Sequence, residues 1–114
     1  TGEVGGAVRE QALVVTTGAG SVVITGCAHP GIVEMVRAAK SADDIALALG
    51  GFHLGSSSGE EIDRDISELK AVGVRHVGPC HCTGDTAVSA FGDAFGDAFI
   101  KAGVGRRIDV RELE

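Results

Sequence analysis

The sequence predicts an α/β fold, because short β-branched runs alternate with amphipathic helical patterns along its 114 residues. Two strand-like runs, 11–17 and 21–25, flank the turn Gly18-Ala19-Gly20, and this arrangement predicts an antiparallel hairpin. After the hairpin, helical and strand-like patterns alternate. The resulting order, ββαβαβαβ, predicts one mixed sheet in which the later strands are parallel and connect through helices.

The middle of the chain predicts a strand between two helices. Residues 32–40 carry apolar side chains at helical spacing, and residues 45–49 form an apolar run of strand length. Ser58 and Glu61 have the spacing of a capping box, which predicts the start of a second helix. Gly73 is placed to end that helix.

The last third of the chain predicts a strand, a helix and a final strand. Residues 74–77 and 104–110 are strand-like, and residues 86–101 have a helical pattern. The helical stretch contains FGDAFGDAF, which spaces three phenylalanines four residues apart. Such spacing predicts an aromatic stripe that faces the core.

Composition and charge predict one domain, 1–114, and exclude two classes of partner. Hydrophobic residues make up 44% of the chain, which is enough to bury a core. The formal net charge is −6 and the densest basic pair is Arg106-Arg107, so nucleic-acid binding is excluded. The longest apolar runs fall far short of the ~20 residues that span a bilayer. With no charged-then-apolar leader in the sequence, we expect a cytoplasmic protein.

Metal-capable side chains gather after three of the predicted strands. All three cysteines and every histidine except His76 follow these strands: Cys27 and His29 after the second, His53 after the third, and Cys80, His81 and Cys82 after the fourth. Loops at the carboxyl ends of parallel strands converge at one sheet edge. Thiolate and imidazole are common ligands of zinc and iron, so the sequence predicts a site there.

The first three of these residues also have structural interpretations. Cys27 can be a small buried hydrophobe, because cysteine is among the most buried residue types. His29, which precedes Pro-Gly, can cap the following helix, and His53 can bond a loop carbonyl. These interpretations stay open at this point.

The segment Cys80-His81-Cys82 has its own alternatives. Cys80 and Cys82 are two residues apart in an extended segment and point to opposite sides, so we expect only one of them to be a ligand. Redox or metal sensing through this segment is a further class of function. His76, inside a strand, is interpreted as a surface residue.

Three segments, VVITGCAHPGIVEMV, ALGGFHL and GPCHCTG, resemble a branch of the metallo-β-lactamase superfamily. That branch includes hydrolases similar to dihydropterin-ribofuranosylaminobenzene-phosphate synthase. The resemblance extends from about Glu10 to Ile108. It implies an αββα sandwich of two similar halves, of which this chain matches the C-terminal half, a mixed sheet with helices on one face.

The resemblance also implies roles for the clustered residues. Cys27 occupies the position of the family's bridging acidic or cysteine ligand, and His81 matches its last histidine ligand. His29 and His53 belong to motifs of the branch and bind substrate or metal. Cys80 and Cys82 are accessory. The implied cofactor is a divalent metal, zinc first, with iron or manganese as alternatives, and its absence from the chain in isolation stays open as a further alternative.

One feature of the family is missing from the sequence. Most ligands of the family's dinuclear site come from an H-x-H-x-D-H motif in the first half, and this chain has no such motif. We therefore expect the C-terminal part of a metal-dependent hydrolase that acts on a small molecule and is incomplete and inactive without an N-terminal half. The alternative is a non-catalytic half-fold that homodimerises through its exposed sheet face.

Overall fold

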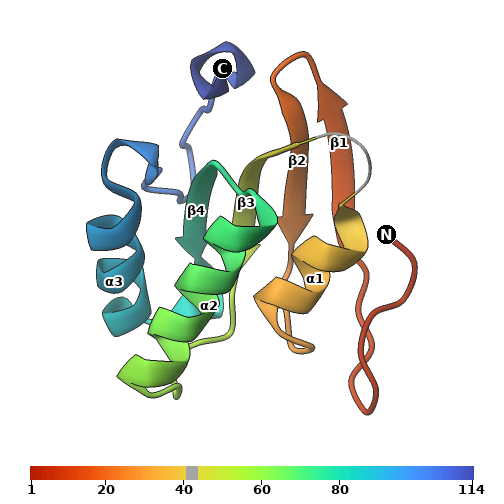
Figure 1. Cartoon of the computed structure of the whole chain (residues 1–114), viewed down its shortest axis with the longest axis vertical. Coiled ribbons are helices and arrows are strands. Elements are labelled where there is room, and N and C mark those ends of the chain that lie inside the picture. Colours follow the sequence, from red (N-terminus) through yellow and green to blue (C-terminus); the bar gives the residue numbers. More distant parts are fainter. Residues whose placement is uncertain (41–43) are drawn as a thin grey trace.

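A computed structural model describes residues 1–40 and 44–114. It contains a four-stranded sheet in the order β1-β2-β3-β4 (Figure 1). β1 (Leu13–Thr17) and β2 (Gly20–Thr25) form the predicted antiparallel hairpin, and β3 (Ile45–Gly51) and β4 (His76–Cys80) continue the sheet in parallel with β2. The predicted mixed sheet and α/β class are confirmed.

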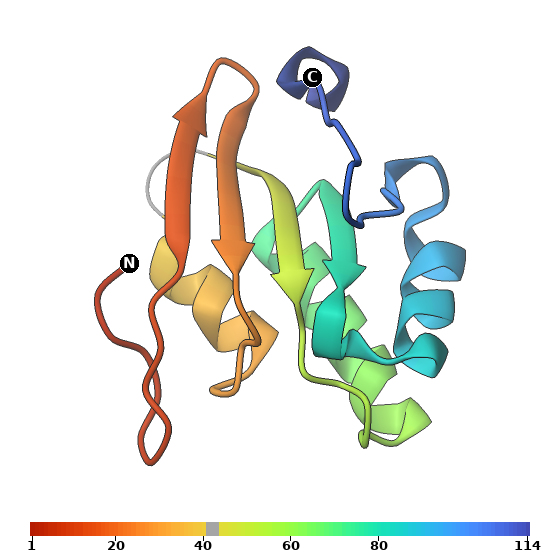
Figure 2. The same ribbon diagram turned by 180° about the vertical axis from the view of Figure 1, so that it is seen from behind.

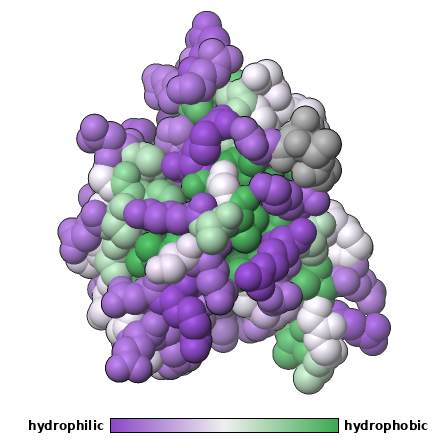
Figure 3. Space-filling view, viewed as in Figure 1, coloured by the Kyte–Doolittle hydropathy of each residue, from purple (hydrophilic) through white to green (hydrophobic). Residues whose placement is uncertain are grey.

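Three helices lie on one face of this sheet. They are α1 (Ile32–Ala39), α2 (Gly59–Val72) and α3 (Asp85–Phe95). Figure 2, seen from behind, shows the strands in front of α1 and α2, with α3 beside the edge strand β4. Hydrophilic residues cover much of the outer surface of the helical layer, with apolar residues visible between them (Figure 3). None of the helices in the described ranges has the length and apolar character needed to cross a membrane.

The main core lies between the helices and the sheet. Val23, Ala48 and Val77 are neighbours across β2, β3 and β4, and all three are fully buried. Because directly paired residues point to the same face, they form one apolar row beneath the helices. Each helix contributes fully or almost fully buried side chains against this row: Ile32, Met35 and Val36 from α1, Ile62 and Leu69 from α2, and Phe91 from α3.

The signals at the ends of α2 act as predicted. The Ser58 hydroxyl accepts the Glu61 backbone N–H, and the Glu61 carboxylate accepts the Ser58 backbone N–H. At the other end, Gly73 has φ 100° in the left-handed region, and its N–H reaches the last helical carbonyls. The two reciprocal bonds satisfy backbone donors that the first helical turn leaves free.

The predicted helix 86–101 is too long. α3 ends at Phe95, because Gly96 adopts φ 52° and ψ −121°, which a residue with a Cβ cannot adopt without strain. The rings of Phe91 and Phe95 stack with centroids 6.0 Å apart. Phe99 is extended and packs against the core from outside the helix. The aromatic stripe therefore faces the core, but a glycine divides it.

The predicted strand 104–110 is wrong. The Ile100 N–H donates to the Val77 carbonyl, and the chain then turns away from the edge of β4. The turn carries a hydrogen bond from the Arg106 N–H to the Gly103 carbonyl, with Val104 fully exposed between its glycines. Turn chemistry at these glycines overrides the β propensity of the surrounding residues.

The helix-free face of the sheet is only partly covered. The C-terminal segment crosses it, and the buried Leu113 packs with Val22 and Leu47. Leu13 and Val15 pair with residues of that same face but remain 61% and 41% exposed. An apolar strip along β1 therefore stays open to solvent.

The capping box generates a prediction for stability. Replacing Ser58 by Ala removes its bond to the Glu61 N–H, and we expect the free energy of unfolding to fall by about 1 kcal/mol. Chemical denaturation measures this change. Ser56→Ala, at an exposed position just before the helix, is the matched control and is expected to stay within about 0.5 kcal/mol of the parent. Equal losses in both variants would contradict the capping role.

Candidate metal centre

Three loops meet at one edge of the sheet. β2, β3 and β4 are parallel, so their carboxyl ends at Thr25, Gly51 and Cys80 lie at the same edge (Figure 2). Each predicted site residue lies at or directly after one of these ends. The topology therefore brings together side chains that are up to 55 residues apart in sequence.

Backbone strain is concentrated in these loops. Within the described residues, the non-glycine residues with positive φ are Ala28 at 56°, His53 at 52° and His81 at 53°. One lies in each of the three loops. A left-handed conformation costs a residue with a Cβ about 1 kcal/mol or more, and such strain persists where the surroundings impose it. Two of the three are histidines proposed from the sequence, so the strain coincides with the candidate site.

Buried hydroxyls connect the loops. Thr83 is fully buried, and its hydroxyl accepts the Phe52 N–H at 3.0 Å and donates to the Cys80 carbonyl at 2.7 Å. The Thr25 hydroxyl donates to the Gly51 carbonyl at 2.9 Å. These bonds tie β2 to β3 and β3 to the short 3-10 helix His81–Thr83. They hold the strained backbone in place.

Cys27, His29 and His53 form a first group of donor atoms. One donor atom from each lies within 4.8 Å of the others, and the Cys27 Sγ is 3.4 Å from the His53 Nδ1. The two imidazole rings have centroids 4.4 Å apart. Both histidines are exposed, whereas Cys27 is half-buried. The group faces solvent with its thiol at the base.

Cys27 also belongs to a second group, with His81 and Cys82. Their donor atoms again lie within 4.8 Å of one another. The Cys27 thiol hydrogen bonds to the Cys82 Sγ at 2.6 Å, and the Cys82 thiol donates to the Cys27 carbonyl at 3.3 Å. Cys27 is thus shared by two groups, a position suited to a bridging ligand.

The Cys27 thiol is held in its neutral form. Its hydrogen bond with Cys82 is the largest cause, and burial and the charges of Cys82 and Glu10 add to it. Together they raise the pKa of Cys27 to about 11. A nearby cation would favour the thiolate instead, because a metal ion deprotonates a coordinating thiol.

Glu10 is a site residue that the sequence analysis missed. Its carboxylate accepts the backbone N–H groups of Ala28 and His29 and bonds the His29 Nδ1. Burial alone would raise the pKa of Glu10, but the bonds with His29 and Ala28 outweigh burial and hold that pKa below its usual value. The predicted antiparallel hairpin could have indicated that Glu10 lies near the site, because it brings residues just before β1 to the carboxyl edge of β2.

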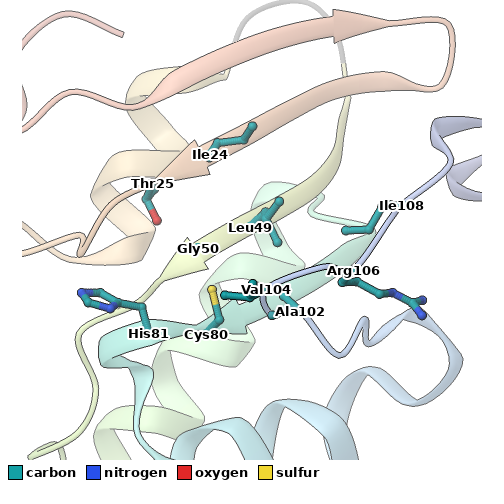
Figure 4. Close-up of a pocket in the computed structure, with 11 residues that line it drawn as sticks. Ile24, Thr25, Leu49, Gly50, Cys80, His81, Ala102, Val104, Arg106 and Ile108 are labelled. Carbon is teal, nitrogen blue, oxygen red and sulfur yellow. The ribbon is translucent and has the colours of Figure 1, made fainter.

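Cys80 lies apart from both groups. It lines a pocket of about 550 Å³ between the helix-free face of the sheet and the C-terminal segment (Figure 4). Ile24, Leu49 and Val104 give this pocket an apolar lining, and the His81 imidazole points away from Cys80. Cys80 and Cys82 thus have different surroundings, but the segment is not extended as the sequence predicted, because Cys82 lies in the 3-10 helix His81–Thr83.

The first group fits a divalent ion in its donor chemistry, and its Cys27–His53 pair also fits in spacing. Ligands around a tetrahedral zinc, at 2.3 Å for sulfur and about 2.05 Å for nitrogen, place a thiolate about 3.6 Å from an imidazole nitrogen. Cys27 and His53 are 3.4 Å apart. Two thiolates on one ion would be about 3.8 Å apart, so Cys27 and Cys82 at 2.6 Å do not fit as two ligands of one ion.

His76 makes no part of this site. It lies at the start of β4, the end of the strand opposite the candidate site, and its Nδ1 is 3.0 Å from the Ala46 carbonyl oxygen. It is half-buried rather than on the open surface that the sequence analysis expected. The hydrogen bond to the neighbouring strand explains the partial burial.

Comparisons with known proteins identify relatives of this chain. The chain is 34% identical over 102 residues to the 7,8-dihydropterin-6-methyl-4-(β-D-ribofuranosyl)-aminobenzene-5'-phosphate synthase of Methanocaldococcus jannaschii, covering 87% of this chain and 35% of that protein. It is 33% identical over 89 residues to an uncharacterised protein of the same organism, covering 78% of this chain and 34% of that protein. No protein-family model matches.

A solved structure extends the likeness to the fold. The crystal structure of Tm1679, a metal-dependent hydrolase of the β-lactamase superfamily, superposes with a TM-score of 0.82 and 40% sequence identity. The match covers 89% of this chain and 40% of that one. The resemblance to the metallo-β-lactamase superfamily is confirmed, and the chain spans about a third of the length of the curated relatives it matches. Its correspondence to a C-terminal half stays a prediction.

Close packing at Gly51 generates a prediction. A Cβ added there would lie 2.4 Å from the Gly26 carbonyl oxygen and 2.8 Å from the Cys82 Sγ. We expect Gly51→Ala to lower the free energy of unfolding by about 2 kcal/mol, because the backbone cannot move aside without breaking strand pairing. Thermal or chemical denaturation tests this. Gly59→Ala, where a Cβ meets nothing within 4 Å, is the control and should be neutral or stabilising.

Proposed function

We propose that this chain, which has the fold of the β-lactamase superfamily of metal-dependent hydrolases, supplies part of a metal centre at the carboxyl edge of its sheet. The observation that carries the proposal is the position of Cys27. Its sulfur belongs at once to the group with His29 and His53 and to the group with His81 and Cys82. A donor shared by two groups is what a bridging ligand requires.

The donor types support zinc as the metal. Thiolate and imidazole together favour zinc, while iron and manganese remain the alternatives because imidazole also suits iron. Cys27 and His81 are the proposed ligands. A divalent ion held by them would act as a Lewis acid on a substrate oxygen. Cys82 is proposed to hydrogen bond the Cys27 thiolate rather than to be a second ligand.

His29 and Glu10 are proposed to act together. The Glu10 carboxylate engages the His29 Nδ1, which leaves the Nε2 free to bind metal or to hydrogen bond a substrate. A carboxylate in this position fixes the ring orientation and favours the tautomer with its proton on Nδ1. His53, whose ring is tilted by 55° to that of His29 and whose φ is 52°, would face the same ligand.

The remaining ligands are proposed to come from an N-terminal half that carries the H-x-H-x-D-H motif. This chain lacks that motif, and its relatives are longer than the part it matches. We propose that the chain on its own is inactive. In the complete assembly, the reaction would be hydrolysis, or a related transfer, on a small molecule. The name of the curated relative, a synthase of a ribofuranosyl-aminobenzene 5'-phosphate, favours a phosphorylated substrate.

A second candidate is a non-catalytic half-fold that homodimerises. The observation that favours it is the exposure of Leu13 and Val15 on the helix-free face of the sheet. Two copies that face each other across this surface would bury both strips and rebuild a two-sheet sandwich. In the first candidate, the N-terminal half covers the same surface instead.

The first candidate predicts metal binding that depends on Cys27. We expect the reduced chain to bind about one zinc ion, as three donor atoms in reach of one another allow. Cys27→Ser should raise the dissociation constant for zinc at least tenfold, or about 1.4 kcal/mol. Isothermal titration calorimetry and elemental analysis measure this. His76→Gln, at the opposite end of β4, is the control and should bind as the parent does. Equal zinc affinity in all three proteins would overturn the proposal.

The second candidate predicts a dimer that apolar contacts hold together. If it is right, light scattering gives twice the chain mass, and the double variant Leu13→Lys, Val15→Lys is monomeric, because two lysines on the buried strip leave unpaired charges in the interface. Val8→Lys is the control, because Val8 is 54% exposed but lies outside the sheet. A monomeric parent protein rules this candidate out.

A further inference from the structure

Cys27 and Cys82 are brought together by the fold rather than by the sequence. They are 55 residues apart, one after β2 and the other in the 3-10 helix after β4. Their sulfurs are 2.6 Å apart, and both side chains are half-buried. Sulfurs in a disulfide bond are about 2.05 Å apart, so a bond needs only about half an ångström of closure.

The surrounding backbone makes room for this contact. Gly51, at the end of β3, lies between the two cysteines, and a Cβ there would lie 2.8 Å from the Cys82 Sγ and 3.2 Å from the Cys27 Cα. The Gly51 N–H also bonds the Gly26 carbonyl, which fixes the residue before Cys27. On the other side, Thr83 directly follows Cys82, and the hydrogen bonds of its buried hydroxyl hold it in place. Both sulfurs therefore sit on constrained backbone.

The third cysteine does not compete for either partner. Cys80 is only two residues from Cys82, but it lines the pocket under the C-terminal segment and takes no part in the two donor groups. The single segment Cys80–Cys82 therefore contains one thiol that has a thiol partner and one that is separate. That difference provides an internal control for any thiol chemistry at this edge of the sheet.

We propose that Cys27 and Cys82 form a reversible disulfide that switches the metal centre off. The two thiols lose two protons and two electrons, both S–H bonds break and one S–S bond forms. A peroxide can take the electrons, with one hydrogen peroxide becoming two waters. A dithiol reductant reverses the step by thiol–disulfide exchange through a mixed disulfide.

The consequence for metal binding rests on the proposed function, whereas the disulfide itself does not. A thiolate, and not a disulfide sulfur, is the metal ligand that cysteine provides. Because Cys27 is shared by both donor groups, one bond removes the thiolate from both at once. A bound ion, conversely, holds the Cys27 sulfur as a ligand and protects it from the oxidant.

Peptide mapping of the whole chain tests the disulfide directly. The reduced, metal-free protein is treated with one equivalent of hydrogen peroxide, its free thiols are alkylated, and it is digested with trypsin. We expect a mass loss of two hydrogens, with the peptide 10–37 that contains Cys27 linked to the peptide 76–101 and a single alkylated thiol at Cys80. Dithiothreitol should restore three free thiols. A Cys80–Cys82 linkage, or sulfinic acid without any linkage, overturns the proposal.

Serine variants assign the bond to its two residues. Cys80→Ser should cross-link at the rate of the parent protein, whereas Cys27→Ser and Cys82→Ser should form no linkage between the two peptides. Circular dichroism establishes that each variant is folded, and the mapping of the parent protein stands independently of them. A cross-link that persists in Cys82→Ser would assign the bond to Cys80 and refute the proposed pair.

Zinc separates this inference from the proposed function. We expect saturating zinc to slow cross-linking at least tenfold and the oxidised protein to bind zinc at least tenfold more weakly than the reduced one. If the disulfide forms but the reduced protein binds no zinc, the proposed disulfide is supported and the proposed metal centre is refuted. If zinc binds and peroxide forms no disulfide, the proposed metal centre is supported and the proposed disulfide is refuted.

Discussion

The close approach of β2 and β3 at their carboxyl ends is the constraint on which the site depends. Gly50 has φ 127°, and a Cβ there would lie 2.1 Å from the Thr25 carbonyl oxygen. A Cβ at Gly51 next to it would lie 2.4 Å from the Gly26 carbonyl oxygen. Two glycines in succession therefore let the loop after β2 pass over the end of β3. Any side chain at either position would push Cys27 away from its partners on the other two loops.

The chemistry-bearing residues stand on backbone that the rest of the fold holds in unfavourable conformations. His53 and His81 are left-handed without being glycines, and the hydrogen bonds of Thr25 and Thr83 connect the segments that carry them. Strain of this kind fixes a side chain direction, because the loop has no relaxed alternative that keeps its bonds. The rigid row of Val23, Ala48 and Val77 beneath the helices supplies the support. The positions of these side chains are therefore set by the fold itself.

Much of this architecture could be predicted from the sequence, and the failures have physical causes. The hairpin, the capping box of α2 and the position of Gly73 follow from local chemistry, so the sequence indicates them directly. The convergence of three loops followed from the strand order alone. The end of α3 at Gly96 was not predicted, because the four-residue spacing of the phenylalanines continues past Gly96 although the backbone there leaves the helical conformation. Glu10 and the contact between Cys27 and Cys82 depend on tertiary distances, which no local pattern contains.

The C-terminal segment that covers the pocket on the helix-free face is less firmly anchored than the strands of the sheet. A backbone bond at Ile100 and a side-chain bond from Arg75 to the Leu113 carbonyl tie its two ends, and the turn at Val104 between them is solvent-exposed. A segment anchored at its ends can open locally at far lower free energy than the strands beneath it. Ala102, Gly103 and Val104 of this segment line the volume beside Cys80, so the width of that volume depends on how closely the segment lies against the sheet. We therefore expect access to that side of the sheet to follow the local stability of this segment rather than the global stability of the fold.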